Sequence, residues 1–88
     1  MSVIATERLL NPGQPELEVY LINRSFSDTC QGDYEFRVER GGPNHSERDG
    51  TFLLGPREEE QLLTYSPGEL KWRVTFGRQE CRKANAHK

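Results

Sequence analysis

Short runs in which apolar and polar residues alternate dominate this sequence. The clearest run covers residues 33–40, and a second covers residues 69–76. Alternation with a period of two is typical of a β-strand that has one face on a core. Both segments are therefore predicted to be central strands, with one set of side chains inward: Tyr34, Phe36, Val38, Leu70, Trp72, Val74 and Phe76.

Weaker runs of the same kind complete the set of predicted strands. They lie at residues 3–10, 17–22, 51–54, 61–65 and 79–83, and residues rich in Gly, Pro, Asn, Asp and Ser separate them. Gly77-Arg78 is predicted to be the turn between the last two strands. Seven short strands in a chain of 88 residues predict an all-β fold, an immunoglobulin-like seven-stranded antiparallel β-sandwich.

The length of the chain indicates one domain. Eighty-eight residues leave no room for a second core. Hydrophobic residues make up 33% of the chain and charged residues 30%, which is a lean composition for a folded domain. We therefore expect a single sandwich over residues 1–83 and a disordered C-terminal tail over residues 84–88.

The cysteines Cys30 and Cys81 are the candidate staple for so small a core. Closing a loop of roughly 50 residues would stabilise the fold by about 4 kcal/mol in the chain-entropy model. From these two residues alone, a disulfide in an oxidising compartment and two free thiols in a reducing cytoplasm are equally consistent. There is no CxxC motif, which disfavours a thioredoxin-like redox centre.

The chain carries no segment that indicates a membrane. Residues 1–10 lack the basic and apolar regions of a signal peptide, and no stretch approaches the roughly 20 apolar residues of a membrane span. We expect no membrane association and, if the protein is exported, a mature form with an added Met1.

Charge is distributed unevenly along the chain. From Leu70 to the C-terminus there are six basic residues and one acid, so this part carries +5 and the remainder −7. This asymmetry predicts surfaces of different sign that would steer a charged partner. Alternation of both signs over a solvated surface fits the composition equally well.

No combination of residues indicates catalysis. His45 and His87 are far apart and lack Cys or carboxylate neighbours at ligand spacing, so no metal or other cofactor is expected. The acids at residues 58–60 are typical of a solvated turn. We expect the protein not to be an enzyme.

Nucleic-acid binding is not indicated either. Alternation places Trp72 and Phe76 on the face opposite Lys71 and Arg73, so these aromatic rings are expected in the core and not as stacking platforms.

Residues 32–52 resemble the CsgH-type curli-assembly proteins, relatives of CsgC. A Gly-x-Tyr triplet at Gly32 is followed by an alternating strand, a Gly-rich turn, Ser46 and a Gly-x-Phe triplet at Gly50. Residues 70–74, with Gly77 and Cys81 after them, resemble the penultimate strand, turn and late cysteine of the family. In the family the partner cysteine lies on the first strand, whereas here Cys30 precedes Gly32.

The resemblance implies a periplasmic inhibitor of amyloid polymerisation that keeps the curli major subunit from assembling early. It implies transient protein binding by a monomer, and an oxidising periplasm suits a bridge between Cys30 and Cys81. The predicted contact residues are Arg37, Lys71, Arg73 and Arg82. They lie at outward positions of predicted strands that would share one sheet in an immunoglobulin-like topology. The alternative is an immunoglobulin-like interaction module of another secretion or adhesion system.

Overall fold

The computed structural model describes residues 2–39 and 45–84, and within them the chain is all β. The side chains of residues 45–47 are outside this description. The strands are β1 (Val3–Asn11), β2 (Gln14–Asn23), β3 (Asp28–Glu39), β4 (His45–Leu54), β5 (Glu59–Tyr65) and β6 (Lys71–Lys83).

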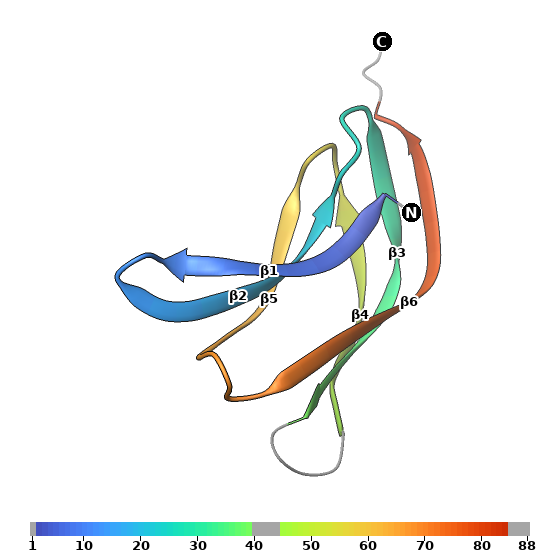
Figure 1. Cartoon of the computed structure of the whole chain (residues 1–88). Coiled ribbons are helices and arrows are strands. Elements are labelled where there is room, and N and C mark those ends of the chain that lie inside the picture. Colours follow the sequence, from blue (N-terminus) through green and yellow to red (C-terminus); the bar gives the residue numbers. More distant parts are fainter. Residues whose placement is uncertain (1, 40–44, 85–88) are drawn as a thin grey trace.

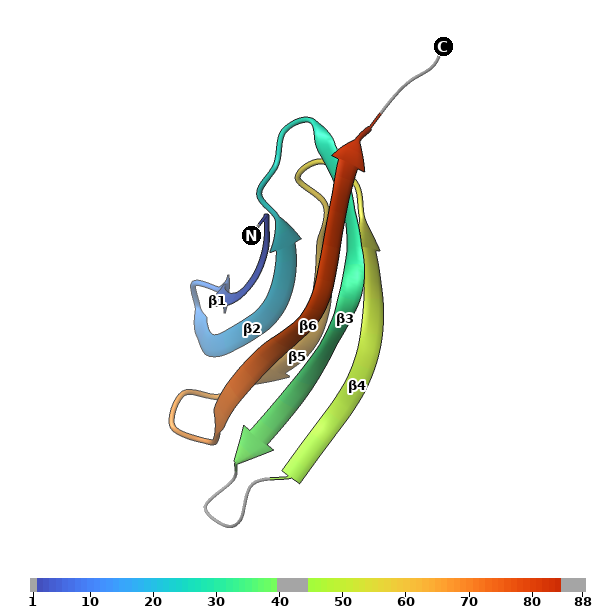
Figure 2. The same ribbon diagram turned by 90° about the vertical axis from the view of Figure 1, so that its right-hand side faces the viewer.

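The strands form two antiparallel sheets of three strands each. The orders are β1-β2-β5 and β4-β3-β6, so β2 and β3 are the central strands. The β1–β2 hairpin extends to the left in Figure 1, whereas β3, β4 and β6 run together on the other side. Figure 2 shows the two layers side by side, with β6 at an edge of the second sheet.

The prediction of seven strands is wrong, because residues 71–83 form one strand where two were expected. The predicted turn at Gly77-Arg78 is a β-bulge, where the register with β3 shifts between Gly32 and Tyr34. The Arg78 N–H donates to Asp33 Oδ1 at 2.7 Å. A Cβ on Gly77 would overlap that carboxylate, so glycine makes room for the bond. The chain bends here and stays on β3.

The core lies between the two sheets. Its buried members come from β1 to β5 and from the segment before β6: Val3, Val19, Leu21, Cys30, Tyr34, Phe36, Val38, Phe52, Leu54, Leu62, Tyr65 and Leu70. The inward direction predicted for Tyr34, Phe36 and Val38 is confirmed. Trp72, Val74 and Phe76 also point inward, yet they are only half-buried at the margin of the cluster.

Some expectations fall on residues that the structure does not describe. The Gly-rich turn at residues 41–44 lies outside the described residues, as does the expected tail apart from Ala84. His87 and the side chain of His45 lie outside them as well.

Candidate functional site: the outer face and free edge of β6

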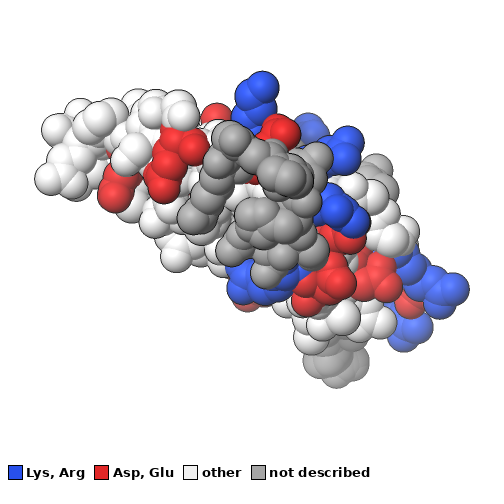
Figure 3. Space-filling model, turned by 90° about the horizontal axis from the view of Figure 1, so that it is seen from below, with Lys and Arg blue, Asp and Glu red and all other residues white. Residues whose placement is uncertain are grey.

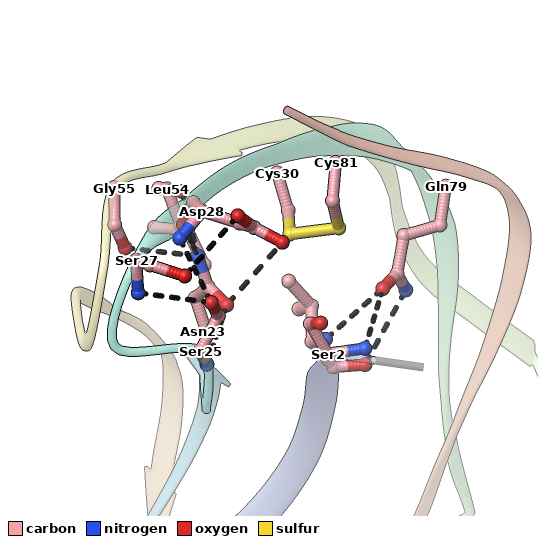
Figure 4. The surroundings of a disulfide bond; sticks show 11 residues. Ser2, Asn23, Ser25, Ser27, Asp28, Cys30, Leu54, Gly55, Gln79 and Cys81 are labelled. Carbon is pink, nitrogen blue, oxygen red and sulfur yellow. Dashed lines mark hydrogen bonds between the residues drawn. A yellow bond between two sulfur atoms is a disulfide. The ribbon is translucent and has the colours of Figure 1, made fainter. Parts of the chain in front are cut away.

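The disulfide joins β6 to the middle strand of its sheet. Cys30 and Cys81 are direct register partners, and their sulfur atoms are bonded at 2.05 Å. Cys30 is fully buried, whereas Cys81 is exposed at the edge of the sheet. Of the two states that the sequence left open for the cysteines, the structure has the disulfide. The bridge fixes the C-terminal end of β6 against β3 (Figure 4).

A buried amide lies beside the disulfide. The Asn23 side chain is 0% exposed. Its Nδ2 donates to the carbonyl oxygens of Asp28, Leu54 and Gly55 at 2.8, 3.0 and 3.0 Å. Its Oδ1 accepts from the Ser25 N–H at 3.0 Å and touches the Cys30 sulfur at 3.7 Å, a contact without a proton because a disulfide sulfur carries none (Figure 4). One side chain thus ties the ends of β2 and β4 to the start of β3.

Gln79 fastens the inner face of β6 to the opposite sheet. Its Oε1 accepts from the N–H groups of Ser2 and Val3 at 3.1 and 3.0 Å, and its Nε2 donates to the Val3 oxygen at 3.4 Å. Figure 4 shows this amide reaching across to the start of β1. Together with the disulfide, these bonds hold the C-terminal half of β6 in a defined position.

The structure brings the predicted contact residues onto one face of one sheet. Arg37 lies on β3, and Lys71, Arg73 and Arg82 lie on β6. Arg37 is the register partner of Arg73, and Lys71 is that of Glu39. The residues of β3 that alternate with Arg37 are buried, which shows that the arginine points outward.

Arg37 is already paired within its own strand. Its guanidinium donates to Glu35 at 2.7 Å, and the carboxylate raises the pKa of Arg37. Among the side chains that the structure describes, those of residues 2–39 and 48–84, Arg73 and Lys71 form no ion pair. The two arginines stand directly opposite each other, an arrangement of like charges that disfavours the sheet slightly and favours an anionic partner.

Basic charge is concentrated on β6 and not on the whole face. The strand carries Lys71, Arg73, Arg78, Arg82 and Lys83 with a single acid, Glu80. The neighbouring strand β3 carries Asp33, Glu35 and Glu39 at outward positions. Seen from below, Lys and Arg atoms lie from the centre to the right of the view with acids among them, whereas the visible left part shows acids but no Lys or Arg (Figure 3).

Several shallow hollows mark this outer face. One, of about 230 Å³, is lined by Arg37, Glu39, Lys71, Trp72 and Arg73. Another, of about 550 Å³, lies over Gly32 and Asp33 and is bordered by the exposed Leu53, Arg78 and Glu80. Both are open and mixed in charge, which suits contact with a polypeptide surface more than enclosure of a small molecule.

An ionic cluster on the other sheet was missed by sequence reasoning. Arg8 donates to Glu18 at 2.9 Å and to both oxygens of Glu59 at 2.6 and 3.2 Å, and it lies 4.1 Å from the centre of the Tyr20 ring. The hydrogen bonds that Arg8 donates to Glu59 and Glu18 raise the pKa of Arg8, and the bond from Arg8 lowers the pKa of Glu59. Arg8 and these acids are therefore partners of one another, unlike Lys71 and Arg73, for which no ion pair is found among the described side chains.

A second unpredicted contact spans the two sheets. Glu7 Oε1 accepts from the Tyr65 hydroxyl at 2.5 Å and from the Trp72 indole N–H at 2.7 Å. These two hydrogen bonds lower the pKa of Glu7. Burial, with the bond to Glu7, raises the pKa of Tyr65. The contact fixes the N-terminal half of β6 as Gln79 fixes the C-terminal half.

Within the described part of the chain, no group of three or more His, Cys, Asp or Glu residues is arranged to hold a metal ion. No helix among those residues has the length and apolar character needed to cross a bilayer. Searches against protein-family models, curated proteins and solved structures find no match to this chain.

Proposed function

We propose that this protein binds the curli major subunit transiently and inhibits its polymerisation into amyloid. The observation that carries the proposal is the basic row along β6, a strand that is held in place at both halves and pairs on one edge only among the described strands. An amyloid-forming chain presents strand edges and polar side chains. A rigid strand of opposite charge would engage such a chain before it adds to a fibre.

The strand order supports an immunoglobulin-like interpretation of the fold. In that sandwich, A, B and E share one sheet, and C′, C, F and G share the other. The orders β1-β2-β5 and β4-β3-β6 match A-B-E and C′-C-F. This match supports the immunoglobulin-like assignment, in which none of the described strands takes the G position.

The disulfide supports an oxidising compartment for this function. Bridged cysteines persist in the periplasm and other exported environments and are rare in a reducing cytoplasm. A periplasmic location would place the protein on the route of a secreted amyloid subunit. The same features suit an interaction module of another secretion or adhesion system, and the test below distinguishes that alternative from inhibition of curli polymerisation.

The test follows polymerisation of purified curli major subunit by thioflavin fluorescence. The protein is added well below the subunit concentration, and the lag phase is compared with that in the presence of an unrelated disulfide-bonded sandwich. We expect a prolonged lag with this protein and none with the control. An unchanged lag would refute the proposal and favour a module of another system.

A further inference from the structure

The outer edge of β6 has no neighbouring strand among the residues that the structure describes. β6 pairs with β3 on one side only, over the whole interval from Lys71 to Lys83. Half of the backbone N–H and C=O groups of an antiparallel edge strand point away from its partner. β6 is therefore a long template for a further strand.

Two hydrogen bonds establish which amides point to the free edge. The Arg78 N–H is directed to Asp33, and the Ala84 N–H donates to the Ser27 oxygen at 2.8 Å. Alternate backbone groups point in opposite directions. The N–H groups of Gln79, Cys81 and Lys83 therefore point outward, whereas those of Glu80 and Arg82 point to β3.

The inner side chains of β6 are incompletely covered. Trp72, Val74 and Phe76 are half-buried and Cys81 is exposed, although the residues opposite them on β3 are buried. These inner residues of β6 lie at the margin of the core because, in the described part of the chain, no strand lies beyond β6 in its sheet. An added strand with apolar inward side chains would cover these residues and remove apolar surface from water, which favours binding.

The outer side chains of β6 define the charge of the occupant. At outward positions Lys71, Arg73 and Arg82 would lie beside the outward residues of an added strand, where opposite charges stabilise the pair. In an antiparallel pair of two β6 strands, the Lys71 and Arg73 end of one copy would lie beside the Arg82 and Lys83 end of the other. Such like-charge pairing disfavours a second copy.

We propose that the free edge of β6 binds an extended segment of another protein in which apolar residues alternate with acidic ones. The segment adds as a seventh strand, with its apolar residues over Trp72, Val74 and Phe76 and its acids beside Lys71, Arg73 and Arg82. This inference rests on the proposed function, since it identifies how an amyloid subunit would be engaged. It adds a defined site and a sequence pattern for the partner.

The test uses a short synthetic peptide of alternating valine and glutamate that is N-methylated at every glutamate. In an antiparallel pair with β6, its valine N–H groups then face β6 with the valines on the inner side, and its other edge cannot pair. The control peptide has the same side chains but is N-methylated throughout, so it has no N–H to donate and carries methyl groups on both edges. We expect the control to bind the oxidised protein about tenfold more weakly or worse, since strand pairing supplies much of the affinity in this mode.

Amide hydrogen exchange followed by NMR locates the peptide. With the singly edged peptide bound, the amides of Gln79, Cys81 and Lys83 should gain protection, whereas Arg78, Glu80 and Arg82 should change little. Arg73→Glu should weaken binding, and Arg24→Glu, an exposed arginine of the β2–β3 loop, should not. Equal binding of both peptides, or protection confined to other strands, would overturn the proposal.

The outcomes separate this site from the proposed function. If the peptide binds at β6 but polymerisation is not inhibited, the strand site stands and the function fails. If inhibition persists while the peptide does not bind, the function stands and the strand site fails. A dimer of the free protein that protects the same amides would overturn the proposal in favour of a second copy.

Discussion

Phe52 of β4 fills the space over Gly32, its register partner on β3, so that a Cβ at Gly32 would lie 3.0 Å from the ring. The reverse pair lies beside it, since a Cβ at Gly50 would lie 2.9 Å from the hydroxyl oxygen of Tyr34. Each aromatic side chain covers a cross-strand glycine. The Gly-x-Tyr and Gly-x-Phe triplets are therefore two halves of one packing arrangement.

Replacement of Gly32 by alanine tests this arrangement. The added methyl would press on the Phe52 ring and overlap the Arg78 carbonyl oxygen, so Gly32→Ala should lower the free energy of unfolding by about 1–3 kcal/mol. Gly13→Ala is the matched control, because nothing lies within 4 Å of a Cβ there. Urea titration followed by Trp72 fluorescence measures both. Similar midpoints for the two variants would contradict the arrangement.

Alternation predicted β3 correctly as a central strand, because its side chains obey a strict period of two between a core and solvent. The prediction that residues 69–76 form a second central strand is wrong, since β6 lies at the edge of its sheet. The turn predicted at Gly77-Arg78 is wrong. Glycine is typical of turns, but the conformation here depends on a hydrogen bond to Asp33, which is 45 residues away from Arg78 in the chain. Bulges arise from cross-strand contacts that a local pattern does not contain.

The candidate site was predictable only in part. The outward parity of Arg37 and Arg73 follows from alternation, but their direct opposition requires the β3–β6 register. The pairing of Arg8 with Glu59 likewise depends on strand order, because β2 separates their strands. Sequence reasoning therefore found the cations but did not distinguish those with internal partners from those on the free edge.

The disulfide should supply a large share of the stability of this small domain. It closes a separation of 51 residues, for which the chain-entropy model gives about 4 kcal/mol. The double variant Cys30→Ala with Cys81→Ala should lose about that amount relative to the oxidised protein in urea titration. Reductant should lower the midpoint of the natural chain and leave that of the variant unchanged. A shift of the variant by reductant would show that another cause is at work.

Asn23 should not tolerate the change to aspartate. Its Nδ2 is the donor for the three carbonyl oxygens of Asp28, Leu54 and Gly55. A buried carboxylate has no donor for them, so Asn23→Asp should cost about 3 kcal/mol or more at neutral pH. Protonation at low pH restores one donor and should reduce the penalty. Asn11→Asp, at an exposed position, is the control and should leave the midpoint nearly unchanged.

Glu7 should make the stability of the fold depend on pH in the acidic range. Hydrogen bonds from Tyr65 and Trp72 hold its native pKa below its unfolded value, which is about 4.3 for glutamate. Its contribution is therefore fully present above that unfolded value and is lost as pH falls through the native pKa. The difference in free energy of unfolding between the natural chain and Glu7→Gln should shrink on acidification from pH 7.

The control for this effect is Glu16→Gln, a change at a glutamate of β2 with no side-chain hydrogen bond within the described part of the chain. It should leave the acid dependence of the natural chain intact. An acid dependence that persists unchanged in Glu7→Gln would assign it to another carboxylate.

Reversal of charge on β6 should separate stability from activity. Arg73 faces Arg37 across the ladder, so Arg73→Glu replaces a like-charge pair by an opposite one, and the urea midpoint should stay the same or rise. The same change removes a cation from the proposed contact surface, so inhibition of curli-subunit polymerisation should weaken.

Inhibition by the natural chain should also fade with salt, because the Debye length falls from about 10 Å at 0.1 M to about 3 Å at 1 M. The control Arg24→Glu should behave as the natural chain in the urea titration and in the polymerisation assay. Full inhibition by the triple variant Arg37→Glu, Lys71→Glu and Arg73→Glu would show that these charges do not carry the activity.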